Sequence, residues 1–235
     1  MDKKVLISFT STYNPNWHQT IADLKKFSVK EFALFVTTIG TADERWQILR
    51  EIKAEVPQVK IPFAHIRPDM SPAELDFLID NFGTQAFNLH PTKEYPLEHD
   101  YSNYLDKIWI ENGGPTIHDG LEVSDIDGFA GICLDLSHLE GGRLQNFPGY
   151  GITTDTLKRF KIGANHISAI STEPVVYGGK PHRFDIHQFS DLSQFDYLKN
   201  FPAEYFGQFI ALELINPVSE QLEAKKYIES IITKE

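Results

Sequence analysis

The sequence predicts an α/β fold, a single (β/α)8 (TIM) barrel in which parallel strands alternate with helices. Short apolar runs recur eight times along the 235 residues, and most are separated by segments with helical periodicity. The length fits one barrel domain over residues 1–235. An open doubly wound sheet is the alternative, but the first apolar run is not followed by the glycine-rich phosphate loop of a dinucleotide-binding sheet.

Each apolar run suits a buried strand of a parallel sheet. Such strands are covered on both faces, so they read as nearly continuous hydrophobic segments. In chain order we expect strands at residues 5–9, 32–36, 61–64, 86–89, 108–110, 131–134, 166–170 and 209–212.

Helices are predicted between most of these strands. The clearest start is Ser71-Pro-Ala-Glu74, with serine as the N-cap, proline at the first position and glutamate three residues later. Gly83 is expected to end that helix. Apolar residues at helical spacing predict further helices at 17–27, 42–56, 97–105, 124–129, 153–160, 193–201 and 219–232. We expect residues 141–151 and 171–191 to be irregular and to lie on the active face of the barrel.

The composition restricts the class of protein. The formal net charge of −11 argues against broad binding of polyanions. The single cysteine, Cys133, excludes an intrachain disulfide, suits a reducing cytosol and lies within an apolar strand, which favours a core position. No apolar run approaches the roughly 18 residues of a membrane span, and no signal peptide precedes the first strand. We therefore expect a cytoplasmic protein with no membrane partner, and we leave its oligomeric state open.

One stretch, Gly131-Ile-Cys-Leu-Asp-Leu-Ser-His138, indicates where the chemistry lies. A buried strand leads directly into Asp135 and, three residues later, His138. Burying a carboxylate and an imidazole without partners costs several kcal/mol, so a metal ion, a substrate or each other must satisfy them. The alternative is an aspartate that caps the next turn beside an exposed histidine.

The same pattern recurs at other strand ends, which converge on one mouth in a barrel. Carboxylates crowded there would repel one another unless cations neutralised them, and imidazole with carboxylate ligands suits Zn²⁺, Mn²⁺ or a similar divalent ion. His182 competes with His187 for one position, and His18, His99 and His118 are expected at the surface. The candidate metal ligands are His65, His90, Glu111, Asp135, His138, His166, Asp185, His187 and Glu213.

At this point the chain resembles the xylose isomerase-like barrel superfamily, and within it most closely the endonuclease IV family of apurinic/apyrimidinic endonucleases. The resemblance covers nearly the whole chain in order and spacing. It is carried by Phe32-Ala-Leu-Phe35, Ala64-His65, Asn88-Leu-His-Pro91, Ile110-Glu-Asn112, Asp135-Leu-Ser-His138, His166 and Leu212-Glu-Leu-Ile-Asn216.

The resemblance implies a centre of up to three Zn²⁺ ions. The first would be held by His65, His90 and Glu111. Glu111 would bridge to a second, held also by Asp135, His166 and Glu213. The third would be held by His138, Asp185 and His187.

The first functional hypothesis is a phosphoester hydrolase in which a metal-activated hydroxide cleaves the ester. Glu111 would bridge two metals and orient the nucleophile, with Glu213 and His138 as further catalytic residues. If the substrate were abasic DNA, a loop would have to push the lesion out of the helix. Candidates for that role are Arg45, Trp46, Arg67, Arg143, Phe147 and Tyr150.

The second hypothesis is a sugar or sugar-phosphate isomerase or epimerase with one metal. Glu111 and Glu213 would exchange protons with the carbon beside a carbonyl, while His138 and Arg183 would bind the substrate. Acidic charge and short loops suit a small sugar. A third reading is a metal-binding barrel without turnover.

Overall fold

The computed structural model describes residues 3–11, 16–113, 120–177 and 180–233, and it confirms the α/β barrel. Parallel pairing joins the strands in the order β1-β11-β8-β7-β6-β5-β4-β3-β2. The two ends of this sheet, β1 and β2, are separated in sequence by Ile7 alone, and they pair with β11 and β3 respectively. The barrel therefore closes through one bent strand. The strands are β1 Lys4–Leu6, β2 Ser8–Thr10, β3 Glu31–Phe35, β4 Lys60–His65, β5 Ala86–Leu89, β6 Ile108–Glu111, β7 Gly131–Asp135, β8 Ile162–Ile167 and β11 Phe209–Leu212.

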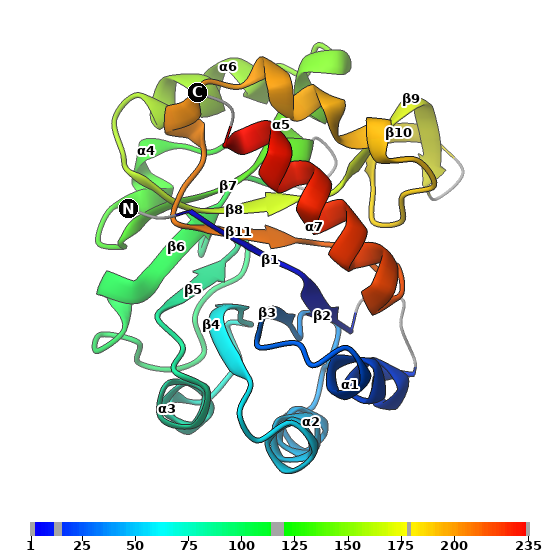
Figure 1. Cartoon of the computed structure of the whole chain (residues 1–235). Coiled ribbons are helices and arrows are strands. Elements are labelled where there is room, and N and C mark those ends of the chain that lie inside the picture. Colours follow the sequence, from blue (N-terminus) through cyan, green and yellow to red (C-terminus); the bar gives the residue numbers. More distant parts are fainter. Residues whose placement is uncertain (1–2, 12–15, 114–119, 178–179, 234–235) are drawn as a thin grey trace.

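Helices lie outside this ring of strands (Figure 1). The predicted capping box is confirmed at α3, where Glu74 accepts a hydrogen bond from the Ser71 backbone N–H at 2.8 Å. Gly83 ends α3 with a φ of 67°, a left-handed conformation that glycine adopts without strain. The α-helices are α1 Trp17–Lys26, α2 Ala42–Glu55, α3 Pro72–Phe82, α4 Val123–Ile126, α5 Leu136–Leu144, α6 Gly149–Leu157 and α7 Val218–Ile232. None of the helices that the structure describes is long and apolar enough to cross a membrane.

The structure corrects several predicted segments. Residues 141–151 belong largely to α5 and α6 rather than to an irregular loop. Residues 171–191 hold most of an antiparallel hairpin, β9 Ala169–Tyr177 and β10 Lys180–Ile186, which lies apart from the barrel strands in Figure 1. The helix predicted at 193–201 is a 3-10 helix, Leu192–Asn200. Shorter 3-10 helices are Leu105–Lys107 and Ala203–Tyr205.

The helix predicted at 97–105 is wrong because side chains hold this segment in turns. Asp100 accepts a hydrogen bond from the Ser102 backbone N–H at 2.9 Å, a local bond that competes with a helix. The Tyr101 hydroxyl donates to the Met70 carbonyl at 2.6 Å, and the Tyr104 hydroxyl donates to Asp76 at 2.7 Å. These contacts fasten the segment to the start of α3.

Small and aromatic side chains fill the barrel interior. Cys133 is buried there, which confirms its predicted core position. Trp109 packs against this cluster, and an added Cβ at Gly163 would overlap the Trp109 ring. Glycine on β8 therefore makes room for the indole. The interior residues are Leu6, Ala33, Phe35, Phe63, Ala86, Cys133, Ala164, Phe209 and Ala211.

We expect Gly163→Ala to lower the free energy of unfolding by about 1–3 kcal/mol, because the methyl group forces Trp109 or its neighbours out of place. Gly40→Ala is the matched control, since an added Cβ there meets nothing within 4 Å. Urea denaturation of both variants measures the difference. Equal stabilities would contradict the packing role of Gly163.

Candidate metal centre

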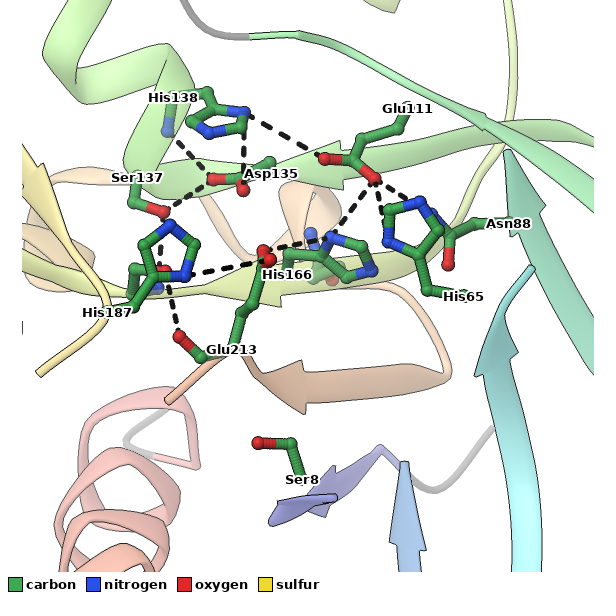
Figure 2. Close-up of polar contacts among 12 residues, drawn as sticks. Ser8, His65, Asn88, Glu111, Asp135, Ser137, His138, His166, His187 and Glu213 are labelled. Atoms are coloured by element: carbon green, nitrogen blue, oxygen red, sulfur yellow. Dashed lines mark hydrogen bonds and ion pairs between the residues drawn. The ribbon is translucent and has the colours of Figure 1, made fainter. Parts of the chain in front are cut away.

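The predicted ligand residues lie at or just after the carboxyl ends of barrel strands, or at the end of the hairpin strand β10. Figure 2 labels all of them except His90 and Asp185. His65, Glu111 and Asp135 are the last residues of β4, β6 and β7, while His90 and Glu213 directly follow β5 and β11. The remaining four lie on α5, on β8 and along the end of β10: His138, His166, Asp185 and His187.

The position predicted for His166 is corrected. It does not begin a strand but lies one residue before the end of β8, which starts at Ile162. The apolar pattern starts late because Gly163 accommodates Trp109 and Asn165 hydrogen-bonds to neighbouring backbone. His166 therefore lies at the carboxyl end of β8, as His65, Glu111 and Asp135 lie at the ends of their strands.

Glu111 lies at the centre of the group. Its Oε2 is 3.2 Å from His166 Nδ1 and 3.6 Å from His65 Nδ1, and its Oε1 is 3.9 Å from His138 Nδ1. Asn88 donates a hydrogen bond to Oε2 at 2.8 Å. One carboxylate is thus within reach of three imidazoles.

The two carboxylate oxygens of Asp135 make different contacts. Oδ1 accepts hydrogen bonds from the Ser137 hydroxyl at 2.5 Å and from the His138 backbone N–H at 2.7 Å, so it does cap α5. Oδ2 is buried, lies 3.3 Å from His138 Nδ1 and has no hydrogen-bond partner among the described residues. His138 is only 7% exposed, so the reading of an exposed histidine is wrong.

The remaining residues extend the same set of contacts. Glu213 lies 3.6 Å from both His166 Nδ1 and His187 Nδ1. His138 Nε2 is 3.7 Å from Asp185 Oδ2. The ring of His90 is 5.0 Å from that of His65, measured between centroids. The structure therefore brings all the predicted ligands into one continuous group.

Among the residues that the structure describes, two groups of ligand atoms are compact enough for a cation, with all their atoms within 4.8 Å of one another. They are His65 with Glu111 and His166, and Glu111 with Asp135, His166 and Glu213. The first contains His166 where the family resemblance implies His90.

Unsatisfied imidazole nitrogens also favour a cation. Both ring nitrogens of His65 are buried without a hydrogen-bond partner in the described part of the chain. Leaving a buried polar group unsatisfied costs about 1–3 kcal/mol. Nitrogen and carboxylate ligands without thiolates suit Zn²⁺ or a similar ion, so the residues present fit a metal site.

The pKa values of the centre follow from burial and mutual charge. Burial lowers the pKa of His65 well below its ordinary value. Burial opposes ionisation of Glu111, but the imidazoles of His166, His90 and His65 lower its pKa well below the usual range. Burial would lower the pKa of His166, whereas Cys133 and Glu111 raise it overall. A proton on His166 can thus offset the charge of Glu111 in the metal-free protein.

Sequence reasoning missed the buried amides that position the ligands. Asn112 donates to the Asp135 carbonyl at 3.0 Å and accepts from the Asp135 backbone N–H at 2.7 Å. Its own carbonyl is 3.1 Å from His138 Nδ1. Asn88 contacts Glu111 as described above. Both amides stand within segments that carry the family resemblance, and that placement was the available signal.

Several predicted residues lie elsewhere. Arg45 cannot insert into a substrate, since it is 1% exposed and paired with Glu74 at 2.7 Å. Trp46 packs against Phe77 on the outer helices, with ring centroids 5.1 Å apart. Exposed His18 and His99 confirm their surface assignment. His118 and the side chains of His182 and Arg183 lie outside the described residues.

The other residues predicted to insert into DNA are hydrogen-bonded to carboxylates or half-buried. Arg67 donates to Asp69 at 2.7 Å, and Arg143 forms two hydrogen bonds with Glu140, at 2.8 and 2.7 Å. Phe147 and Tyr150 are half-buried. Both arginines are therefore paired with carboxylates.

Comparison with known proteins supports the fold. No family model matches the chain, and no curated protein matches it in sequence. The structure of the IOLI protein with a binding zinc atom gives a TM-score of 0.51 at 15% identity, covering 97% of this chain and 98% of that one. A xylose isomerase domain protein from Planctomyces limnophilus gives 0.49 at 12% identity, covering 99% of each chain.

An uncharacterized B. cereus protein gives a TM-score of 0.46 at 12% identity. The match covers 96% of this chain but only 65% of that one, so the chain spans about two thirds of its length. At 15% identity the likeness to the IOLI structure supports the fold and leaves the reaction to the chemistry of the site.

Proposed function

We propose that this chain is a divalent-metal-dependent phosphoester hydrolase with a multinuclear centre. The observation that carries the proposal is the convergence of nine ligand-type side chains in one continuous, largely buried group. A single metal needs only about four protein ligands. The additional imidazoles and carboxylates have a role if more than one ion is bound.

The proposed ligand sets share Glu111. It would serve one ion with His65 and His90 and a second with Asp135, His166 and Glu213. His138, Asp185 and His187 would hold a third ion, and the 3.7 Å contact between His138 and Asp185 supports that set. Zn²⁺ suits these ligands, and Mn²⁺ is an alternative.

Bound divalent ions would supply a hydroxide near neutral pH and would stabilise negative charge on the phosphate oxygens. The protein residues have simpler tasks. Glu111, held by Asn88, keeps one oxygen between two imidazoles. Asp135 uses one oxygen to cap α5 and keeps the other directed toward His138. The proposed substrates are abasic DNA or a small sugar phosphate.

A sugar isomerase or epimerase is the second candidate, and the compact group of Glu111, Asp135, His166 and Glu213 favours it. These four residues suffice for one ion. Glu111 and Glu213 would then exchange protons with a carbon beside a carbonyl. The similar IOLI structure contains zinc, which supports a metal in this barrel without indicating the reaction.

Metal content and substrate panels separate the candidates. We expect more than one Zn²⁺ per chain by elemental analysis, together with hydrolysis of bis(p-nitrophenyl) phosphate that a chelator removes and added Zn²⁺ restores. An abasic-site duplex, assayed in parallel, tests the larger substrate. A single ion with turnover of a ketose panel would contradict the hydrolase and support the isomerase. Bound metal without turnover of any panel would indicate a non-catalytic barrel.

A further inference from the structure

Among the described residues, the side chain of Asn88 makes one hydrogen bond, and that bond goes to the central carboxylate. The residue is fully buried on β5, where its Cα pairs in register with that of His65. Its Nδ2 donates to Glu111 Oε2 at 2.8 Å, as Figure 2 shows. Among the described residues, its Oδ1 is buried without a hydrogen-bond partner.

Other buried asparagines of the barrel behave differently. Asn165 donates to the carbonyls of Leu134 and Tyr205 at 3.0 and 2.9 Å and accepts from the Gly207 N–H at 2.7 Å. Both ends of its amide therefore tie strands and loops together, which is a structural role. A buried amide that leaves its oxygen unsatisfied costs about 1–3 kcal/mol, so Asn88 is a poor choice for stability alone.

The position of Glu111 explains what Asn88 contributes. Oε2, the oxygen that Asn88 binds, is the same oxygen that lies 3.2 Å from His166 Nδ1 and 3.6 Å from His65 Nδ1. A donor on Oε2 fixes the rotation of the carboxylate, so that this oxygen faces both imidazoles. A glutamate side chain has three rotatable bonds, and without the donor its orientation is set only by the imidazoles.

We propose that Asn88 is a positioning residue that orients the Glu111 carboxylate toward the imidazoles with which it would hold a metal ion. This inference rests on the metal centre of the proposed function, but it does not depend on which substrate is turned over. It predicts that the Asn88 amide strengthens metal binding, whereas its unsatisfied oxygen lowers the stability of the metal-free protein.

Asn88→Leu tests both effects, because leucine is close to asparagine in size but has no hydrogen-bond donor. We expect the Zn²⁺ affinity of the metal-free protein to fall by about 10–100-fold, measured by titration calorimetry with a competing chelator. The thermal unfolding midpoint of metal-free Asn88→Leu should stay close to that of the wild type, because removing the unsatisfied oxygen offsets the loss of the hydrogen bond to Glu111. Asn165→Leu is the matched control and should show the reverse: a lower midpoint and nearly unchanged Zn²⁺ affinity.

Three results would overturn the inference: a Zn²⁺ affinity of Asn88→Leu equal to that of the wild type, a loss of stability as large as that of Asn165→Leu, or a wild-type protein that takes up no Zn²⁺. The hydrolase proposal can fail separately. If the wild type cleaves no phosphoester while Asn88→Leu still weakens Zn²⁺ binding, Asn88 remains a positioning residue and only the assigned reaction is wrong.

Discussion

Glu111→Gln is expected to abolish phosphoester hydrolysis and to lower the metal content of the purified protein. Glutamine keeps the size of the side chain but loses the charge that offsets the buried imidazoles, and its amide nitrogen cannot ligate a cation. Loss of a residue that only hydrogen-bonds to a metal ligand typically lowers metal affinity or activity by about 10–100-fold. Because Glu111 contacts His65, His138 and His166 directly, we expect its loss to cost more than about 100-fold in kcat/KM.

Glu204→Gln is the matched control, because it makes the same chemical change at an exposed position. It should keep both the metal content and kcat/KM of the wild type. Elemental analysis and steady-state kinetics on the folded variants measure the two effects. A Glu111→Gln protein with wild-type metal content and rate would remove Glu111 from the centre of the proposed mechanism.

The barrel could be predicted from sequence because its strands are short apolar runs. The runs at 86–89 and 209–212 coincide with β5 and β11, and a helix follows most of the others. Prediction was wrong for β8, where Gly163 and Asn165 interrupt the apolar pattern. Gly163 leaves room for the Trp109 ring, and Asn165 hydrogen-bonds to backbone groups of other elements. Both causes are tertiary contacts, which a local pattern does not reveal.

The candidate site was predictable where ligand-type residues end apolar strands, as His65 and Glu111 do. The site was harder to predict from sequence where irregular backbone positions a residue. Asp185 is placed by a hairpin whose register is interrupted by bulges, and residues 171–191 carried no pattern that indicated strands. Asn88 stands out in the sequence only through the family resemblance, since nothing in the sequence shows that its amide binds a carboxylate on the next strand.

Arg45, on an outer helix of the barrel, is another residue whose surroundings could not be predicted from the sequence. Its place in the first turn of α2, after a strand, suggested an exposed loop residue. In the structure it is 1% exposed and lies between Glu74, which is 0% exposed, and Asp69. Its guanidinium donates to Glu74 at 2.7 and 3.3 Å, to Asp69 at 3.2 Å and to the Ile39 carbonyl at 3.1 Å. Burial alone would lower the pKa of Arg45, but the hydrogen bond and charge of Glu74 raise it.

Arg45→Met is therefore expected to lower the free energy of unfolding by about 3–5 kcal/mol, because it leaves the Glu74 carboxylate buried without its counter-charge. Urea denaturation measures the loss. The double variant Arg45→Met/Glu74→Gln should recover part of it, since the buried charge is removed and glutamine can still accept from the Ser71 N–H. Lys199→Met, which breaks an exposed pair with Asp196, should leave the stability unchanged. If Arg45→Met cost less than about 1 kcal/mol, the buried pair would contribute no more than a surface pair, and burial would not be what makes Arg45 important for folding.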